Sequence, residues 1–454
     1  MTTTAFFHAR HAWLGAEHTT AGQTPGTTTD GVVSDVLIEV RDGRFAAVTA
    51  GVAEPPAAAV RLPGLVLPGL ANVHSHAFHR ALRGRTHGDR GSFWTWRERM
   101  YDVARRLDPD NYFALARAVY GEMALAGVTC VGEFHYVHHD PMGRPYADPN
   151  VMGGALIAAA ADAGIRITLL DALYLASGVD GAPLEGVQRR FGDGDLDGWS
   201  DRTGRLTAAS HVRLGVALHS VRAVPARYFK EFAVRAGARP VHVHVSEQRA
   251  ENEQCLAAHG RTPTALLADH GVLGATTTAV HATHLTAGDI AALGASRTGV
   301  CLCPTTERDL ADGIGPGRAL ADAGSPLSLG SDSHAVVDVF EEARGVELHE
   351  RLAGERRGRF AADELLHAAT AAGHAALAWT DAGRIAVGAR ADLVAVSLDS
   401  VRTAGVDPSG AVFAATAADV AHVVVDGRLV VAEGRHAGMD VPAALRDAIA
   451  AVTR

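Results

Sequence analysis

Short apolar runs alternate along most of the chain with longer stretches in which apolar residues recur every three or four positions. The longer stretches predict amphipathic helices, as in Tyr112–Ala126, Val151–Ala163, Pro225–Ala236 and Val337–Leu352. The apolar runs predict strands at about residues 66–74, 128–136, 166–175, 212–219, 240–246, 277–283, 298–304 and 326–332. Eight strands with helices between them indicate a (β/α)₈ TIM barrel, and alternation alone leaves a doubly wound sheet as the alternative.

The two ends of the chain show a different pattern, in which strands are separated by tight polar turns. Near the start, Asp35–Val40 and Phe45–Val48 flank the turn Arg41–Arg44, which predicts a hairpin. A similar pattern returns at Ala391–Val396 and Val423–Val431. We therefore predict one small β-sandwich domain built from both ends, residues 1–65 and 384–454, with a terminal helix in the second part. The barrel then spans residues 66–383.

Metal-binding residue types stand where several predicted barrel strands end. His74 and His76 are two residues apart, so they leave the same face of a strand. With 24 His in the chain, an isolated pair of this kind is often only a surface or core pair. However, His244, His281 and Asp332 end three further predicted strands, and catalytic residues of a barrel gather at the C-terminal ends of its strands. This convergence favours a metal site.

Composition narrows the function classes. The 454 residues are 47% hydrophobic and 20% charged, which suits a globular protein with a large core. The net charge of −9 argues against a nucleic-acid partner, so we expect a small-molecule substrate. Residues Met1–Gly22 lack a cationic segment followed by an apolar core, and no run approaches the ~18 apolar residues of a membrane span. We therefore expect a cytoplasmic protein without a membrane partner.

The four cysteines form no C-x-x-C pair, which predicts buried free thiols; they are Cys130, Cys255, Cys301 and Cys303. The chain has a single lysine, Lys230, which lies in the helical stretch after the fourth predicted strand.

The predicted ligands favour hydrolytic chemistry. Three imidazoles and a carboxylate, His74, His76, His244 and Asp332, suit one Zn²⁺ per chain, with Fe²⁺ and Mn²⁺ as alternatives. Such an ion lowers the pKa of water to about 7. Glu247, three residues after His244, is placed to move a proton between this water and a leaving group. His281 is the candidate for polarising the bond under attack. His284 competes for this role, and we prefer His281 because it directly ends the apolar run.

These residues together resemble the amidohydrolase superfamily over nearly the whole chain. The resemblance implies a metal-dependent barrel with a composite β-domain. Some members hold two metals bridged by a carboxylated lysine from a barrel strand, but Lys230 lies outside the predicted strands, so a mononuclear site is implied. Mononuclear members with H-x-x-E on the fifth strand are typically deaminases.

Within this superfamily, the chain is similar to the N-formimino-L-glutamate deiminases of histidine degradation. The segments that carry the similarity are 73–82, 93–98, 132–139 and 303–307. The resemblance implies that the substrate is held by His79, Arg97, Tyr136, His219 and Arg222. Guanidinium groups suit its two carboxylates, which they bind through paired hydrogen bonds. We also expect a homodimer.

The chain departs from this family's pattern at two places. His79 replaces a glutamine, and Arg308-Asp309 interrupts a run that is usually more apolar. These changes leave open another formimino amino acid as substrate. The rival hypotheses are a deaminase of the same fold that acts on a purine, pyrimidine or triazine ring, and a non-catalytic scaffold. Two arginines near the metal argue against a ring deaminase, and the filled ligand positions argue against a scaffold.

Overall fold

A computed structural model describes residues 4–15, 31–87 and 93–454 of the chain. Of the segment Met1–Gly22, residues 1–3 and 16–22 therefore lie outside the described part. No described helix combines the length and the apolar character that a membrane crossing needs.

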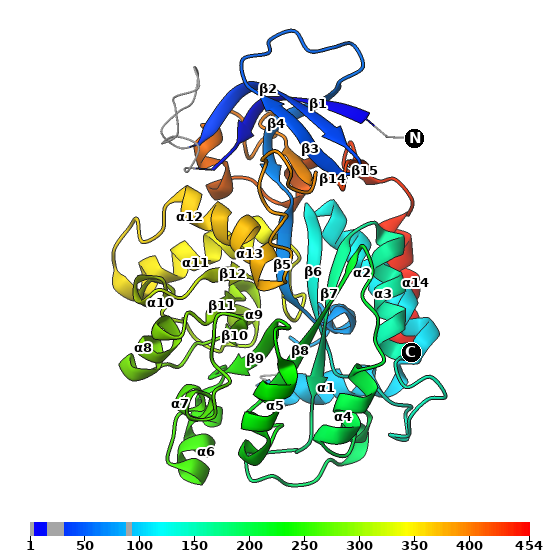
Figure 1. Cartoon of the computed structure of the whole chain (residues 1–454), viewed down its shortest axis with the longest axis vertical. Coiled ribbons are helices and arrows are strands. Elements are labelled where there is room, and N and C mark those ends of the chain that lie inside the picture. Colours follow the sequence, from blue (N-terminus) through cyan, green and yellow to red (C-terminus); the bar gives the residue numbers. More distant parts are fainter. Residues whose placement is uncertain (1–3, 16–30, 88–92) are drawn as a thin grey trace.

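Eight parallel strands form a barrel, as the alternating pattern predicted (Figure 1). They are β5 (Leu70–Ser75), β6 (Val128–His135), β7 (Arg166–Leu173), β8 (Val212–Ser220), β9 (Val241–Val245), β10 (Thr277–His281), β11 (Gly299–Leu302) and β12 (Leu327–Leu329). They pair in chain order, and a parallel bridge between Ser75 and Asp332 joins the last strand region to the first. The barrel is therefore nearly closed, and the doubly wound alternative is wrong.

Helices follow or separate the strands. They are α1 (Phe93–Arg106), α2 (Pro109–Leu125), α3 (Val151–Ala163), α4 (Leu196–Thr203), α5 (Phe229–Ala236), α6 (Arg249–His259), α7 (Pro263–Asp269), α8 (Ala287–Ala295), α9 (Pro304–Asp309), α10 (Gly317–Ala323), α11 (Val339–Gly354), α12 (Ala362–His367), α13 (Gly373–Ala376) and α14 (Val441–Thr453). The four predicted helical stretches correspond to α2, α3, α5 and α11. The terminal helix α14 lies against α2, and Arg106 donates a hydrogen bond to the carbonyl of Val452.

The strands at the two chain ends form one mixed sheet, which lies above the barrel in Figure 1. In spatial order they are β16 (Arg435–His436), β15 (Arg428–Ala432), β14 (Val420–Val425), β13 (Leu393–Val396), β4 (Val60–Pro68), β1 (Thr4–Trp13), β2 (Val32–Arg41) and β3 (Arg44–Thr49). The predicted hairpin is β2–β3, with its turn at Asp42-Gly43. The small domain is thus composite, as the sequence predicted.

The run at about 66–74, predicted as one strand, is two strands of different sheets. Residues 60–68 pair with β1 and β13 in the mixed sheet, whereas Leu70–Ser75 pair in the barrel. The break is at Gly69, where an added Cβ would lie 2.3 Å from Oγ1 of Thr129. A continuous apolar run hides this break because both strands are buried.

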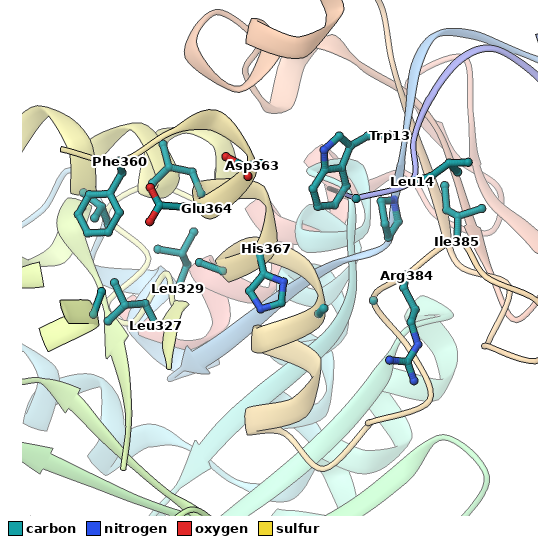
Figure 2. A pocket seen from close by; sticks show the side chains of 18 of the residues that line it. Trp13, Leu14, Leu327, Leu329, Phe360, Asp363, Glu364, His367, Arg384 and Ile385 are labelled. Carbon is teal, nitrogen blue, oxygen red and sulfur yellow. The ribbon is translucent and has the colours of Figure 1, made fainter. Parts of the chain in front are cut away.

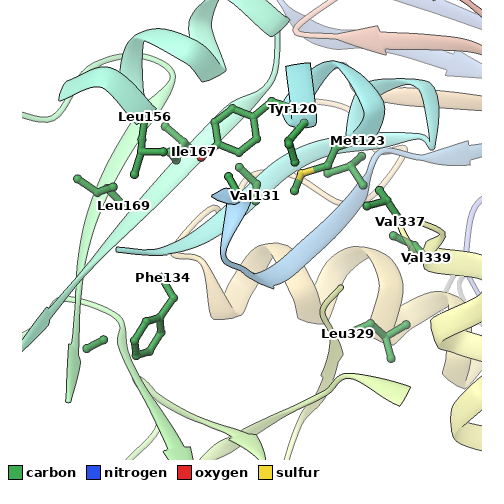
Figure 3. Close-up of a cluster of buried hydrophobic side chains, with 14 of the residues drawn as sticks. Tyr120, Met123, Val131, Phe134, Leu156, Ile167, Leu169, Leu329, Val337 and Val339 are labelled. Atoms are coloured by element: carbon green, nitrogen blue, oxygen red, sulfur yellow. The ribbon is translucent and has the colours of Figure 1, made fainter. Parts of the chain in front are cut away.

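Apolar side chains fill the space between the barrel and its helices (Figure 3). Tyr120 and Met123 of α2 and Leu156 of α3 lie in the same core cluster as Val131 and Ile167 of the strands. Phe134 leaves the opposite face of β6 from Val131, since side chains alternate along a strand. Phe134 therefore lies on the side of the barrel that carries the histidines described next.

The barrel and the mixed sheet are also joined by a buried ion pair. Arg166, at the start of β7, pairs with Asp392 and, at 3.1 Å, with Asp426 next to β14. Both Arg166 and Asp392 are almost fully buried. Because one charge of a buried pair is costly without the other, this contact fixes the two layers relative to each other.

Candidate metal centre and active site

Strand ends that are far apart in sequence bring four candidate ligands together. β5 supplies His74, His76 follows its last residue, β9 supplies His244, and Asp332 follows β12. One ligand atom from each lies within 4.8 Å of all the others, and all four residues are buried. Nε2 of His74 is 3.0 Å from Nε2 of His244 and 3.4 Å from Oδ1 of Asp332.

The barrel closure fixes these residues through the backbone. The N–H of Asp332 donates to the carbonyl of His74, and the N–H of His76 donates to the carbonyl of Asp332. Asp332 and His281 have φ values of 41° and 67°, in the left-handed region that side chains other than glycine rarely adopt. Such conformations cost about 1–3 kcal/mol each and are concentrated at functional sites.

Hydrogen bonds aim the imidazoles at the cluster. Nδ1 of His76 donates to the carbonyl of Phe134, and Nδ1 of His244 donates to the carbonyl of His219. These bonds leave Nε2 of both rings as a lone pair that faces the other ligands, an arrangement typical of metal-bound histidines.

The pKa shifts of these groups also favour the protonation states that bind a metal ion. Burial, with the neighbouring His74, lowers the pKa of His76 to about 3, and burial lowers the pKa of His74 and His244 as well. Burial alone would raise the pKa of Asp332, but contact with His74 outweighs it and lowers the pKa below its ordinary value. Neutral imidazoles and an ionised carboxylate are the forms that bind a divalent cation.

The donor set fits a divalent metal ion, because three imidazole nitrogens and one carboxylate oxygen converge. We predict that purified protein binds about one divalent ion per chain. Elemental analysis after dialysis checks this, and His244→Ala should lose the ion. Two tightly held ions per chain would contradict a mononuclear site. Lys230 lies on α5, outside the barrel strands, which agrees with a site that has no lysine bridge.

His281, at the end of β10, lies between three carboxylates. Its Nε2 is 3.7 Å from Asp332 and 3.9 Å from Glu247, and its Nδ1 is 3.5 Å from Glu307. Burial alone would lower the pKa of His281, but these carboxylates outweigh it and raise the pKa well above its ordinary value. His281 can therefore carry a proton beside the cluster, where it would stabilise developing negative charge. The competitor His284 does not line this pocket.

The ligands open into a pocket of about 70 Å³ that is lined by every residue the sequence suggested for substrate binding. These residues are His79, Arg97, Tyr136, His219 and Arg222, and the candidate catalytic residues Glu247, His281 and Asp332 also line it. Nε2 of His79 lies 3.0 Å from the hydroxyl of Tyr136, and the ring of His219 contacts that of His244.

The two arginines of the pocket differ in their partners. Arg222 donates to Glu247 at 2.9 Å and lies 3.1 Å from Glu251. Arg97 lies over the ring of Trp94, and its buried Nε has no hydrogen-bond partner in the described part of the chain.

Sequence reasoning missed Glu251 and Glu307 as site residues. Glu251 is buried on α6 and accepts a hydrogen bond from the N–H of Ser246, so it braces the turn that carries Glu247. Glu307 accepts from the N–H of Cys303 and faces His281. Glu307 could have been identified as a site residue because it follows the end of a predicted strand. Nothing in the sequence singled out Glu251, because acidic residues are common in the first turn of helices.

The departures from the family pattern lie at the pocket and beside it. His79 contacts Tyr136 within the pocket, whereas Asp309 pairs with His87 at 2.7 Å and Arg308 pairs with Glu341 at 2.6 Å. Arg308 and Asp309 therefore have partners outside the ligand cluster.

A second buried group of potential ligands comprises His135, His138 and Asp171. Arg202 donates to both oxygens of Asp171 at 2.7 Å, and the nitrogens of His138 face His135 and the carbonyl of Ala172. These contacts engage Asp171, both nitrogens of His138 and Nε2 of His135, while Nδ1 of His135 has no hydrogen-bond partner among the described residues. They fix the segment after β6, which carries Tyr136. We interpret this group as a structural network.

A larger cavity, of about 500 Å³, lies elsewhere, between α12, β12 and the end of β1 (Figure 2). Its walls are mainly apolar, with Trp13, Leu329 and Phe360 among them, and it includes none of the candidate ligands. All four cysteines are buried and free, as predicted.

Comparison with known proteins agrees with this geometry. Residues 65–430 match the Amidohydrolase family. A formimidoylglutamate deiminase of Pseudomonas aeruginosa is 40% identical over 84% of this chain and 87% of its own. The structure of an amidohydrolase from Brucella melitensis superposes with a TM-score of 0.88 at 33% identity, over 99% of this chain and 100% of the other. A zinc-bound adenosine deaminase of Xanthomonas campestris has the same fold, with a TM-score of 0.82 at 24% identity over 98% and 97% of the two chains.

Most of the chain thus matches one family, and the four candidate ligands converge in the structure. The chain belongs to the amidohydrolase family and is a hydrolase that acts on C–N bonds.

Proposed function

We propose that the protein hydrolyses N-formimino-L-glutamate to N-formyl-L-glutamate and ammonia, a step of histidine degradation. The observation that carries the proposal is the pocket, in which Arg97 and Arg222 lie together with the candidate metal ligands. A substrate with two carboxylates and one hydrolysable C–N centre suits this combination. The similarity to a formimidoylglutamate deiminase supports the same substrate.

The proposed roles follow from the positions of the side chains. A divalent ion held by His74, His76, His244 and Asp332 would act as a Lewis acid and activate a water molecule. Water adds to the formimino carbon, and Asp332 takes up a proton from it. The C=N bond of the protonated formimino group becomes single as water adds. Glu247 then carries the second proton of this water to the departing nitrogen, the C–N bond breaks as the C=O bond forms, and ammonia leaves. His281 stabilises the tetrahedral species that forms in between.

The remaining pocket residues bind and orient the substrate. Arg97 and Arg222 hold the carboxylates, while His79, Tyr136 and His219 line the same pocket with their rings beside those of the candidate ligands His76 and His244. Correct orientation of the formimino carbon toward the water accounts for a large part of the rate in such reactions.

The alternative is a deaminase that acts on a purine, pyrimidine or triazine ring. This alternative is compatible with the fold, because the Xanthomonas campestris protein of the same fold is an adenosine deaminase. A ring substrate carries no carboxylate, so the guanidinium of Arg97, which has no carboxylate partner among the described residues, would lie beside it without one. The pocket therefore favours the dicarboxylate.

An ammonia-release assay tests the choice between the two. Metal-loaded protein is given formiminoglutamate, formiminoaspartate or guanine, and the product of the first is identified by NMR as N-formyl-L-glutamate. We expect the highest kcat/KM with formiminoglutamate. Faster ammonia release from guanine than from either dicarboxylate would contradict the proposal. Zinc as the resident metal and the homodimer stay predictions, which elemental analysis and light scattering check.

A further inference from the structure

Two tyrosines without an assigned role line the substrate pocket. Tyr101 lies on α1, and Tyr174 follows β7. Both hydroxyls lie near one amide group, since Nε2 of Gln188 is 3.2 Å from the hydroxyl of Tyr101 and 3.4 Å from that of Tyr174. A single side chain thus aligns two phenol groups at the wall of the pocket.

The hydrogen bonds of Gln188 fix the direction of donation. Its Oε1 accepts from the backbone N–H of Glu185 at 3.4 Å, so its NH₂ group faces the tyrosines. An amide NH₂ has two hydrogens, one for each phenol oxygen. Each tyrosine oxygen therefore accepts from Gln188, and each keeps its own hydrogen for another acceptor. Burial raises the pKa of Tyr174, so this phenol stays protonated.

Arg97 lies beside these hydroxyls. It precedes Tyr101 by four residues on α1, so the two side chains share one face of the helix. Its guanidinium carbon is 5.6 Å from the centre of the Tyr101 ring. The structure gives Arg97 no carboxylate partner among the described residues, whereas Arg222 is paired with two carboxylates. The uncompensated positive charge of the pocket is therefore at the tyrosine wall.

The tyrosine wall is also separated from the metal ligands. The ring centres of Tyr174 and His219 are 4.5 Å apart, and those of His219 and His244 are 5.0 Å apart. One ring thus stands between Tyr174 and the nearest ligand on this path. The carboxylates that line the pocket, Glu247 and Asp332, are those of the catalytic end.

We propose that Arg97, Tyr101 and Tyr174 form the subsite for the substrate carboxylate that lies farther from the reacting carbon, with Gln188 as the positioning residue that aligns the two phenols. This rests on the proposed function, in which that group is the γ-carboxylate of formiminoglutamate. One guanidinium and two O–H donors match the acceptor positions of a carboxylate.

Paired substrates test the subsite. Formimino-L-glutamine has nearly the same shape as formiminoglutamate but carries a neutral amide at the γ position. Each of Tyr101→Phe and Tyr174→Phe should lower kcat/KM for formiminoglutamate by roughly 10-fold, mainly through KM, because each removes a hydrogen bond to a charged group that is remote from the reacting carbon. The same variants should change kcat/KM for formimino-L-glutamine by much less. Tyr228→Phe, which removes a phenol hydroxyl outside the pocket, is the matched control.

Gln188→Glu tests the positioning role. A carboxylate at this position accepts hydrogen bonds from the tyrosines, so it turns both phenol hydrogens away from the pocket and adds a negative charge. The preference for formiminoglutamate over formimino-L-glutamine should collapse, with kcat for the amide largely kept. A purely structural role of Gln188 would lower activity with both substrates to the same extent. Equal losses with both substrates in the Tyr101→Phe/Tyr174→Phe double variant would overturn the proposal.

A binding measurement separates this proposal from the proposed function. Glutarate carries two carboxylates and no reactive group, so its affinity can be measured by calorimetry whatever reaction the enzyme catalyses. We expect wild-type protein to bind glutarate at least 10-fold more tightly than the Tyr101→Phe/Tyr174→Phe double variant. Equal affinities, or no binding by wild-type protein, would overturn the subsite. The proposed function fails separately, when wild-type protein releases no ammonia from formiminoglutamate.

Discussion

Glu247→Gln is expected to lower kcat by about 10²-fold or more while the protein keeps its metal. The substitution preserves the size of the side chain and removes its ability to carry a proton. An amide oxygen can still accept the hydrogen bond that Arg222 donates at 2.9 Å, so the pocket should stay intact. Steady-state kinetics with formiminoglutamate, together with elemental analysis, measure both quantities.

The control for this substitution is Glu342→Gln. Glu342 is also buried, but it lies on α11, where it accepts hydrogen bonds from Thr305, and it does not line the pocket. Its substitution should leave kcat unchanged within a few fold. If Glu247→Gln has as small an effect as Glu342→Gln, another group carries the proton, and His281, with its Nε2 3.9 Å from Glu247, is the next residue to change.

The barrel could be predicted because its strands are buried on both faces and so appear as continuous apolar runs. The same property concealed the break at Gly69, since β4 and β5 are both apolar although they belong to different sheets. The composite sheet could be predicted from hairpin turns such as Asp42-Gly43, whose chemistry is local.

The convergence of the four candidate ligands could be predicted from strand ends because a barrel brings all C-terminal ends to one face. The pairing of Arg222 with Glu251 could not, since it depends on how α6 leaves β9 rather than on any spacing in the sequence. The contact of Gln188 with the two tyrosines could not be predicted either. Gln188 lies in a short 3-10 helix far from Tyr101 in the chain, and only the folded structure brings its amide to the two phenols.

Substitution of either pocket arginine by alanine is expected to lower kcat/KM for formiminoglutamate, at a cost of about 2–5 kcal/mol in transition-state stabilisation. The reason is that a substrate carboxylate loses its charged partner in a buried pocket. The two variants should differ in whether the loss appears in KM or in kcat. Arg97 has no carboxylate partner among the described residues, so Arg97→Ala should act mainly through KM. Arg222 also holds Glu247, so Arg222→Ala should lower kcat as well. Kinetics at varied substrate concentration separate the two parameters, and both variants should keep their metal.

Lysine should restore little activity at either position, because an ammonium group cannot form the paired hydrogen bonds of a guanidinium. Arg105→Ala, on the exposed side of α1, and Arg227→Ala, close to α5, remove arginines outside the pocket and serve as matched controls. The dicarboxylate assignment is wrong if Arg97→Ala and Arg222→Ala both process formiminoglutamate with near wild-type efficiency. Loss of activity in Arg222→Ala alone, with KM unchanged, would instead assign Arg222 to the positioning of Glu247 and leave Arg97 as the arginine that binds substrate.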